Sequence, residues 1–223
     1  MGYGRAVAVP GQARRRYDAS GRRRRAQDNR DRVLAAARRL FVADGYPGTS
    51  ITRIAAEAGV SSRTVFGMFA SKAGLLKEVL DIAVAGDADA VPLHERPAMR
   101  AVHASRTAAE AVERLADAFA EVAARSHEVW TVVHGAAAVD PEIAQLERTL
   151  GEQRLTGAGY IAATIADRLD LTDPDAVERL RDAVWVLGAP QQYGLVRERG
   201  WSDRRYRDWA ARTLAATLLD GGG

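Results

Sequence analysis

The stretch IAAEAGVSSRTVFGMFASKAGLL (Ile54–Leu76) holds two short apolar-patterned segments that meet at a Gly-Val-Ser corner. A helix-turn-helix needs a short first helix, a turn of three or four residues that often contains glycine, and a second helix whose first side chains face the major groove. Ala55 and Ala58 are small enough for close helix contact, Gly59 permits a left-handed turn, and Val60 can fill the core beneath it. The alternative is an ordinary corner between two buried helices.

The residues before the corner predict a helix on which it would pack. Apolar residues recur from near Asn29 with the spacing of one helix face, at Val33, Leu34, Ala37, Leu40 and Phe41. Gly45 is expected to end this helix, and YPGTS (Tyr46–Ser50) to form a turn before the next one. Ser71 is expected to cap a fourth helix that fades near Gly86.

Polar side chains gather where a DNA-reading helix would begin. Ser61 is expected to cap that helix, which places Ser62, Arg63 and Thr64 on its first turn. Short hydroxyl groups and a guanidinium suit base edges and phosphates. Lys72 starts the next helix, where backbone N–H groups and an ammonium make a candidate phosphate site. Together with the preceding amphipathic helix, this pattern favours a helix-turn-helix.

The net charge of +3 conceals an asymmetry along the chain. Residues 1–80 contain sixteen Lys/Arg against six Asp/Glu, whereas residues 81–223 contain sixteen against twenty-three. This split indicates a nucleic-acid or membrane-surface module joined to a neutral or acidic body, and the alternative is a disordered arginine tail on a plain globular protein. Residues 1–28, which include Arg22–Arg25, have little to bury and are expected to be a disordered arm.

The remaining composition restricts the class of protein. The absence of cysteine excludes disulfides and thiolate metal sites, which fits a cytoplasmic protein. No signal peptide and no transmembrane run of about 18 apolar residues is recognised, so no membrane partner is expected.

The body is predicted to be helical as well. GDADAVPLHERPA (Gly86–Ala98) is expected to be a connector, followed by a helix over Ala108–Arg125 and a separate apolar piece from about Glu128 to Val139. The Asp-Pro pairs at Asp140 and Asp173 predict two helix starts. The expected fold is all-α with about nine helices. Its parts are the arm (1–28), a helix-turn-helix domain (29–76) and a helical body (77–223).

No residue arrangement predicts catalysis. The four histidines lack H-E-x-x-H spacing, and ordinary placement of His127 and His134 is favoured over a metal pair. We therefore expect no enzyme, no cofactor and no metal site.

Aromatic and polar residues on several body helices suit an apolar cavity, although each of them also suits ordinary core packing. The candidate cavity residues are Phe119, Trp130, Val133, His134, Tyr160, Thr164 and Trp185. A four-helix seam between two copies is expected from Trp185, Tyr193, Trp209 and Leu214, and packing within one subunit is the alternative.

The segment VLAAARRLFVADGYPGTSITRIAAEAGVSSRTVFGMFASKAGLL (Val33–Leu76) resembles the DNA-binding domain of the tetracycline-repressor (TetR) family of bacterial transcriptional regulators. The resemblance implies a homodimer that reads the two half-sites of a palindromic operator, and a small-molecule effector bound in each body. Carried over by position, the residues implied to face DNA are Ser50, Thr52, Ser62, Arg63, Thr64, Gly67, Met68 and Lys72. Phe66 stands where many members have tyrosine, so it offers no hydroxyl to a phosphate.

The predicted function is therefore a homodimeric, sequence-specific regulator, most simply a repressor that an apolar or amphipathic ligand releases from its operator. Two alternatives remain open at this point. One is a helical enzyme acting on an apolar substrate, and the other is an architectural DNA binder without operator choice.

Overall fold

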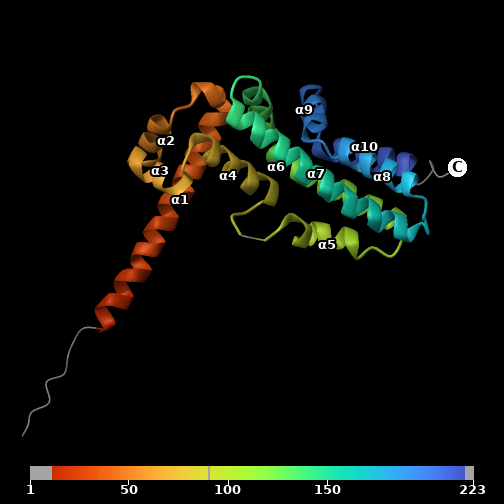
Figure 1. Cartoon of the computed structure of the whole chain (residues 1–223), viewed down its shortest axis with the longest axis horizontal. Helices are drawn as coiled ribbons and strands as arrows, with labels where there is room; N and C mark the ends of the chain where they lie inside the picture. The colour runs from red at the N-terminus through yellow and green to blue at the C-terminus, as the bar shows by residue number, and fades with distance from the viewer. Residues whose placement is uncertain (1–11, 90, 219–223) are drawn as a thin grey trace, which may run out of the picture.

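The computed structural model describes residues 12–89 and 91–218, which form an all-helical fold (Figure 1). Ten α-helices and one 3-10 helix follow one another in these ranges, and none of these residues lies in a strand. This confirms the predicted all-α class, with one helix more than expected. In the part of the chain that is described, no helix is long and apolar enough to cross a membrane.

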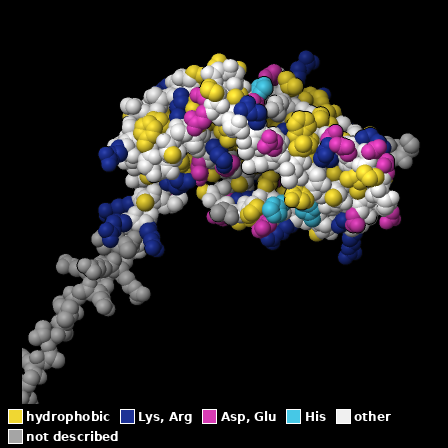
Figure 2. Space-filling model, in the orientation of Figure 1, with side chains coloured by type: hydrophobic (Ala, Val, Ile, Leu, Met, Phe, Trp, Pro, Cys, Tyr) yellow, Lys and Arg dark blue, Asp and Glu magenta, His cyan; other side chains and the backbone are white. Residues whose placement is uncertain are grey.

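Helix α1 (Gln12–Gly48) begins inside the segment that we expected to be disordered. The side chains from Ser20 to Asp28 are exposed. Figures 1 and 2 show this end projecting away from the rest of the molecule, and Figure 2 shows Lys and Arg side chains on its coloured part. Arginine, alanine and glutamine have high helix propensities, so a charged segment without an apolar face can extend a helix that packing stabilises further along. The described part of this segment is thus helical, and Met1–Gly11 lie outside the described residues.

The break that we expected at Gly45 is present. This glycine has a φ of 71° and interrupts the helical conformation of α1. The buried Thr49 holds the turn that follows, because its hydroxyl lies 2.8 Å from the carbonyl oxygen of Gly45 and 3.1 Å from that of Leu40. The chain is thereby turned into the next helix.

Three short helices complete the N-terminal domain, which are α2 (Ile51–Ala58), α3 (Ser62–Phe69) and α4 (Lys72–Ala85). Each begins at a serine whose side chain accepts a backbone N–H three residues on, as sequence predicted for Ser61 and Ser71. The apolar face of α1 packs against these helices in one core.

The body contains η1 (Leu93–Glu95), α5 (Pro97–His103), α6 (Ala108–Ala137), α7 (Pro141–Arg168), α8 (Pro174–Leu187), α9 (Pro190–Glu198) and α10 (Asp203–Leu218). Asp140 and Asp173 cap α7 and α8 as predicted, each accepting two backbone N–H groups. The segment Gly86–Ala98, expected to be a connector, contains the 3-10 helix η1 and the first two residues of α5. One expectation was wrong. The apolar pieces on either side of Ser126 form the single helix α6. Ser126 does not interrupt this helix, because its side chain is fully buried on the inner face of α6.

The long helices α6 and α7 join the two parts of the molecule. Trp130 and Val133 of α6 and Ile143 of α7 belong to the same buried cluster as the N-terminal domain. A second cluster, formed by α5, α6, α7, α8 and α10, lies in the body. Helix α4 contacts α1, α3, α6 and α7, so it lies between the two parts.

Candidate nucleic-acid interface and cavity

The corner between α2 and α3 has the geometry of a helix-turn-helix. Gly59 adopts φ 67° and ψ 36°, the left-handed conformation that ends α2, and the N–H of Val60 donates to the carbonyl oxygen of Ala55 at 3.0 Å. A side chain at Gly74 would collide with the carbonyl oxygen of Phe69. The close approach of α4 to the end of α3 therefore requires glycine at this position.

The residues that we expected to face DNA form what we call the reading surface: Ser50, Thr52, Ser62, Arg63, Thr64, Gly67, Met68 and Lys72. Ser50 and Thr52 of the α2 start are exposed, as are Arg63 and Gly67 of α3. Ser62 is half-buried, and Thr64 is half-buried with its hydroxyl 2.8 Å from that of Ser61. The guanidinium of Arg63 is thus the most available polar group on the first turn of α3.

Met68 and Lys72 are less free than the sequence pattern indicated. Met68 is half-buried and packs against the N-terminal core. The ammonium of Lys72 donates to the carbonyl oxygens of Tyr46 (2.9 Å) and Thr49 (3.2 Å), and it lies 3.9 Å from the centre of the Tyr46 ring. An ammonium has three N–H donors. These two bonds use two of the three donors of Lys72, which leaves one N–H for another acceptor.

Phe66 is a feature of this surface that sequence reasoning undervalued. Its side chain is 51% exposed on α3, next to Gly67 and one turn after Arg63. An exposed aromatic on α3 offers apolar contact to sugars or to a thymine methyl group. The missing hydroxyl had led us to discount this position.

The body contains a cavity of about 790 Å³, lined by residues from α4, the segment after it, α5 to α8 and the start of α9. Four of the seven predicted cavity residues line it, namely Phe119, Trp130, Tyr160 and Trp185. The other three do not. Val133 is fully buried in the N-terminal core, and His134 is exposed, with Nδ1 2.7 Å from a carboxylate oxygen of Glu147. Thr164 does not line the cavity, but its hydroxyl is hydrogen-bonded to His103, which does.

Comparison with known proteins identifies the N-terminal part. Residues 33–79 match the family described as bacterial regulatory proteins of the tetR family. The chain carries a TetR-family DNA-binding domain. No curated protein matches the chain in sequence. TetR-family members are regulators rather than enzymes, in agreement with our expectation from the residues.

Solved structures share the TetR fold over most of the chain. A protein from Rhodococcus sp. described as a TetR-family transcriptional regulator has a TM-score of 0.54, with 18% identity over 85% of this chain and 98% of its own. A regulator from Saccharomonospora viridis in complex with choline has a TM-score of 0.56, with 22% identity over 85% and 96%. The regulator FadR from Bacillus subtilis in complex with stearoyl-CoA has a TM-score of 0.62, with 14% identity over 84% and 96%. At these identities the likeness shows the fold.

Within the TetR-type body, two of the four residues expected at a dimer seam are buried in the subunit itself. Tyr193 is 2% exposed and its hydroxyl lies 2.6 Å from a carboxylate oxygen of Asp203, while Leu214 is fully buried between body helices. The spacing of aromatic residues and leucines on a helix does not distinguish a dimer seam from packing within the subunit, because both need the same apolar stripe. Trp209 is half-buried and Trp185 remains 38% exposed.

His103, which lines the cavity, was not expected there. The hydroxyl of Thr164 donates to the carbonyl oxygen of Tyr160 (3.0 Å), so it accepts a hydrogen bond from Nδ1 of His103 at 2.7 Å. Burial lowers the pKa of His103, and the positive charge of Arg168 lowers it further. The lowered pKa favours the neutral form of His103, and the bond to Thr164 favours the tautomer with the proton on Nδ1.

Proposed function

We propose that the chain is a homodimeric TetR-family regulator that binds a palindromic operator and is released from it by a small molecule in the body cavity. The observation that carries the proposal is the position of α4. Leu75 and Leu76, near its start, are fully buried in the core of the DNA-binding domain. Ile82 and Val84, near its end, line the cavity. One helix therefore contacts both the DNA-reading domain and the candidate effector site.

The end of α4 is also tied to neighbouring helices by charged groups. The guanidinium of Arg125 on α6 donates to the carbonyl oxygens of Ala83 and Val84, and Arg38 of α1 donates to the carbonyl oxygen of Arg125. A ligand that moves the end of α4 would alter these contacts. The proposed response is a population shift, in which the bound state holds the reading helices at a spacing that no longer matches major grooves about 34 Å apart.

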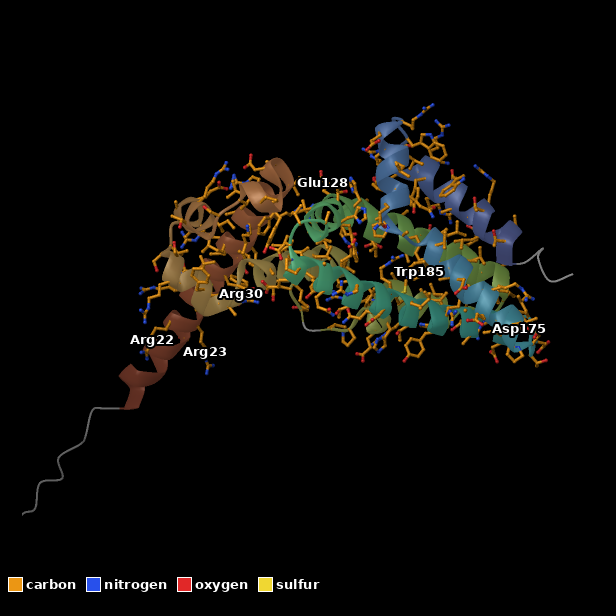
Figure 3. The ribbon with its side chains drawn as sticks, turned by 45° about the horizontal axis from the view of Figure 1, so that its top comes forward. Arg22, Arg23, Arg30, Glu128, Asp175 and Trp185 are labelled. Atoms are coloured by element: carbon orange, nitrogen blue, oxygen red, sulfur yellow. The ribbon has the colours of Figure 1, made fainter. Side chains whose placement is uncertain are left out.

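Base recognition is proposed to rest on Arg63, with Thr52, Ser62 and Thr64 beside it and Phe66 as an apolar contact. Lys72 is proposed to add one phosphate contact through its remaining N–H. Figure 3 shows Arg22 and Arg23 on the projecting part of α1, and the side chains of Arg23–Arg25 are exposed. These arginines are proposed to contact phosphates beside the operator. The dimer face is proposed to use Trp185 with the exposed Val186.

The test is selection of bound sequences from a random duplex pool with the full chain at about 150 mM salt, a condition that suppresses purely electrostatic binding. A palindrome with half-sites one or two helical turns apart is expected. Sedimentation of the complex on the selected duplex should give two chains per site.

A pool that stays random while binding is tight would instead support the architectural alternative. The variant with Arg23, Arg24 and Arg25 changed to alanine separates the two. It should still select the palindrome if α3 reads the sequence, and it should lose nearly all binding if the arginine-rich start of α1 is the main binder.

A further inference from the structure

The wall of the body cavity contains a cation without a carboxylate partner. Arg154 of α7 is the only lysine or arginine among the described residues that line the cavity. One guanidinium N–H donates to the backbone carbonyl oxygen of Trp185 at 2.8 Å, and no carboxylate of the described chain forms an ion pair with it. Burial lowers the pKa of Arg154, with no acidic neighbour to oppose the change. A half-buried guanidinium without a carboxylate partner favours an anionic ligand that can balance its charge.

The acidic side chains around the same cavity are mostly neutralised by other groups. Glu78 pairs with Arg30, Asp81 pairs with Lys77 at 2.5 Å, and Asp87 pairs with Arg96 at 2.6 Å. The remaining carboxylate, Asp89, is exposed in the segment after α4. The charge of Arg154 is therefore left for a ligand to balance.

The two tryptophans of the wall argue against a cationic ligand. The guanidinium carbon of Arg154 lies 5.6 Å from the ring centre of Trp185 and 6.0 Å from that of Trp130. Aromatic faces of this kind are the usual site for an ammonium ligand. Here the chain's own guanidinium lies beside both rings, so an ammonium ligand would meet a like charge there.

The rest of the cavity is suited to an apolar chain or ring system. From Arg154, the wall continues along α7 through Gly157 and Ile161 toward His103. The helix rises by roughly 10 Å from Arg154 to Ile161. Burial of His103 at the far end lowers its pKa, which disfavours a second cation there. A volume of about 790 Å³ lies within the range of ligand-binding pockets, roughly 300–1,000 Å³.

We propose that the cavity binds an amphipathic organic anion, with its acidic head group on Arg154 and its apolar body along α7. This assignment rests on the proposed function, because it names the chemical class of the effector. The head group is a carboxylate or another oxyanion, since a guanidinium binds such groups through two parallel hydrogen bonds.

The test is a direct binding measurement on the full chain without DNA, with three probes of equal chain length, each kept in its monomeric, dissolved range. These are decanoate, decanol and decyltrimethylammonium, and the readout is quenching of tryptophan fluorescence supported by titration calorimetry. Decanoate is expected to bind at least tenfold more tightly than decanol, and decyltrimethylammonium more weakly than both. Failure of decanoate to bind, or a preference for the ammonium probe, overturns the proposal. Decyl phosphate then compares oxyanion head groups.

The variant Arg154→Met should remove the preference for decanoate over decanol and leave the affinity for decanol within about threefold. Arg154→Lys keeps the charge without the planar donors and should retain part of the preference, which provides a second test if the methionine variant folds poorly. Arg148→Met is the matched control, because Arg148 is exposed on the same helix and does not line the cavity. An unchanged preference in Arg154→Met overturns the assignment of the head-group site.

Release from the selected operator duplex is measured separately. Decanoate that binds through Arg154 without releasing DNA would refute the proposed effector response and support the anion site. Release by all three probes equally, with no role for Arg154, would support the effector response and refute the anion site.

Discussion

The DNA-binding domain and the body are both built from amphipathic helices, yet one has a closed core and the other is hollow. Phe41, Ile54, Val65 and Leu75 of the N-terminal domain are fully buried and interdigitate in one cluster. The body surrounds a cavity of about 790 Å³. The two regions therefore place different demands on their side chains.

The difference shows what each region requires of its side chains. The closed core belongs to the DNA-binding domain, which must hold the side chains of the reading surface at fixed positions. Short helices with serine caps provide that rigidity. In the hollow body, Tyr160 and Trp185 line the cavity and remain 62% and 38% exposed, so these rings lack part of the packing that a core residue has. Helix α4 takes part in both regions, and the proposed effector response depends on this feature.

The largest expected effect tests whether the two regions differ in packing. Phe41→Ala removes a fully buried ring and should lower the free energy of unfolding by about 3–5 kcal/mol. Phe119→Ala removes a half-buried ring that already borders the cavity, and should cost about 1–2 kcal/mol. Urea denaturation of both variants checks this, and equal losses would show that the cavity is not open around Phe119.

The next effect concerns base reading by the closed domain. Arg63→Ala should weaken binding to the selected operator by about 1–3 kcal/mol and relax one base position, because the exposed guanidinium loses its base-edge contact. Gel-shift titrations on the operator and on random duplexes measure it. Equal losses on both kinds of DNA would reassign Arg63 to a phosphate contact.

A smaller effect separates the structural role of Lys72 from its proposed role on DNA. Lys72→Met removes two hydrogen bonds to backbone carbonyl oxygens, so the domain should lose about 1–2 kcal/mol of stability. Binding to all DNA should weaken as well, with the salt slope reduced by roughly one. Thermal melts and salt titrations check the two parts separately. A normal salt slope in a destabilised variant would confine Lys72 to the turn at Tyr46.

The smallest effect belongs to the body and depends on pH. Because burial lowers the pKa of His103, the folded protein binds fewer protons at this site than the unfolded chain does. Stability should therefore fall as the pH drops below about 6.5, the ordinary histidine value. His103→Gln should show a smaller decrease in Tm than the unchanged protein between pH 7.5 and 5.5. The same decrease in both would mean that other groups cause it.

Most of the N-terminal domain could be predicted from the sequence because its determinants are local. The serine caps, the break at Gly45 and the left-handed turn at Gly59 each depend on a few neighbouring residues. Two local signals misled us. The charged start of α1 is helical because helix propensity and continuity outweigh the lack of an apolar face. Ser126 interrupts the apolar pattern of α6 without interrupting the helix.

The sequence by itself determined the helical class, the starts of the helices at Asp140 and Asp173, and the corner that carries the reading surface. Only the tertiary structure decided which aromatic residues line the cavity and that Tyr193 and Leu214 are buried within the subunit. It also decided that Lys72 donates a hydrogen bond to the backbone of the turn at Tyr46. It alone brought Arg154 to the tryptophans of two other helices. The physical reason is range: a cap or a turn is set by the next few residues, whereas burial and pairing depend on side chains that the fold brings together from distant positions.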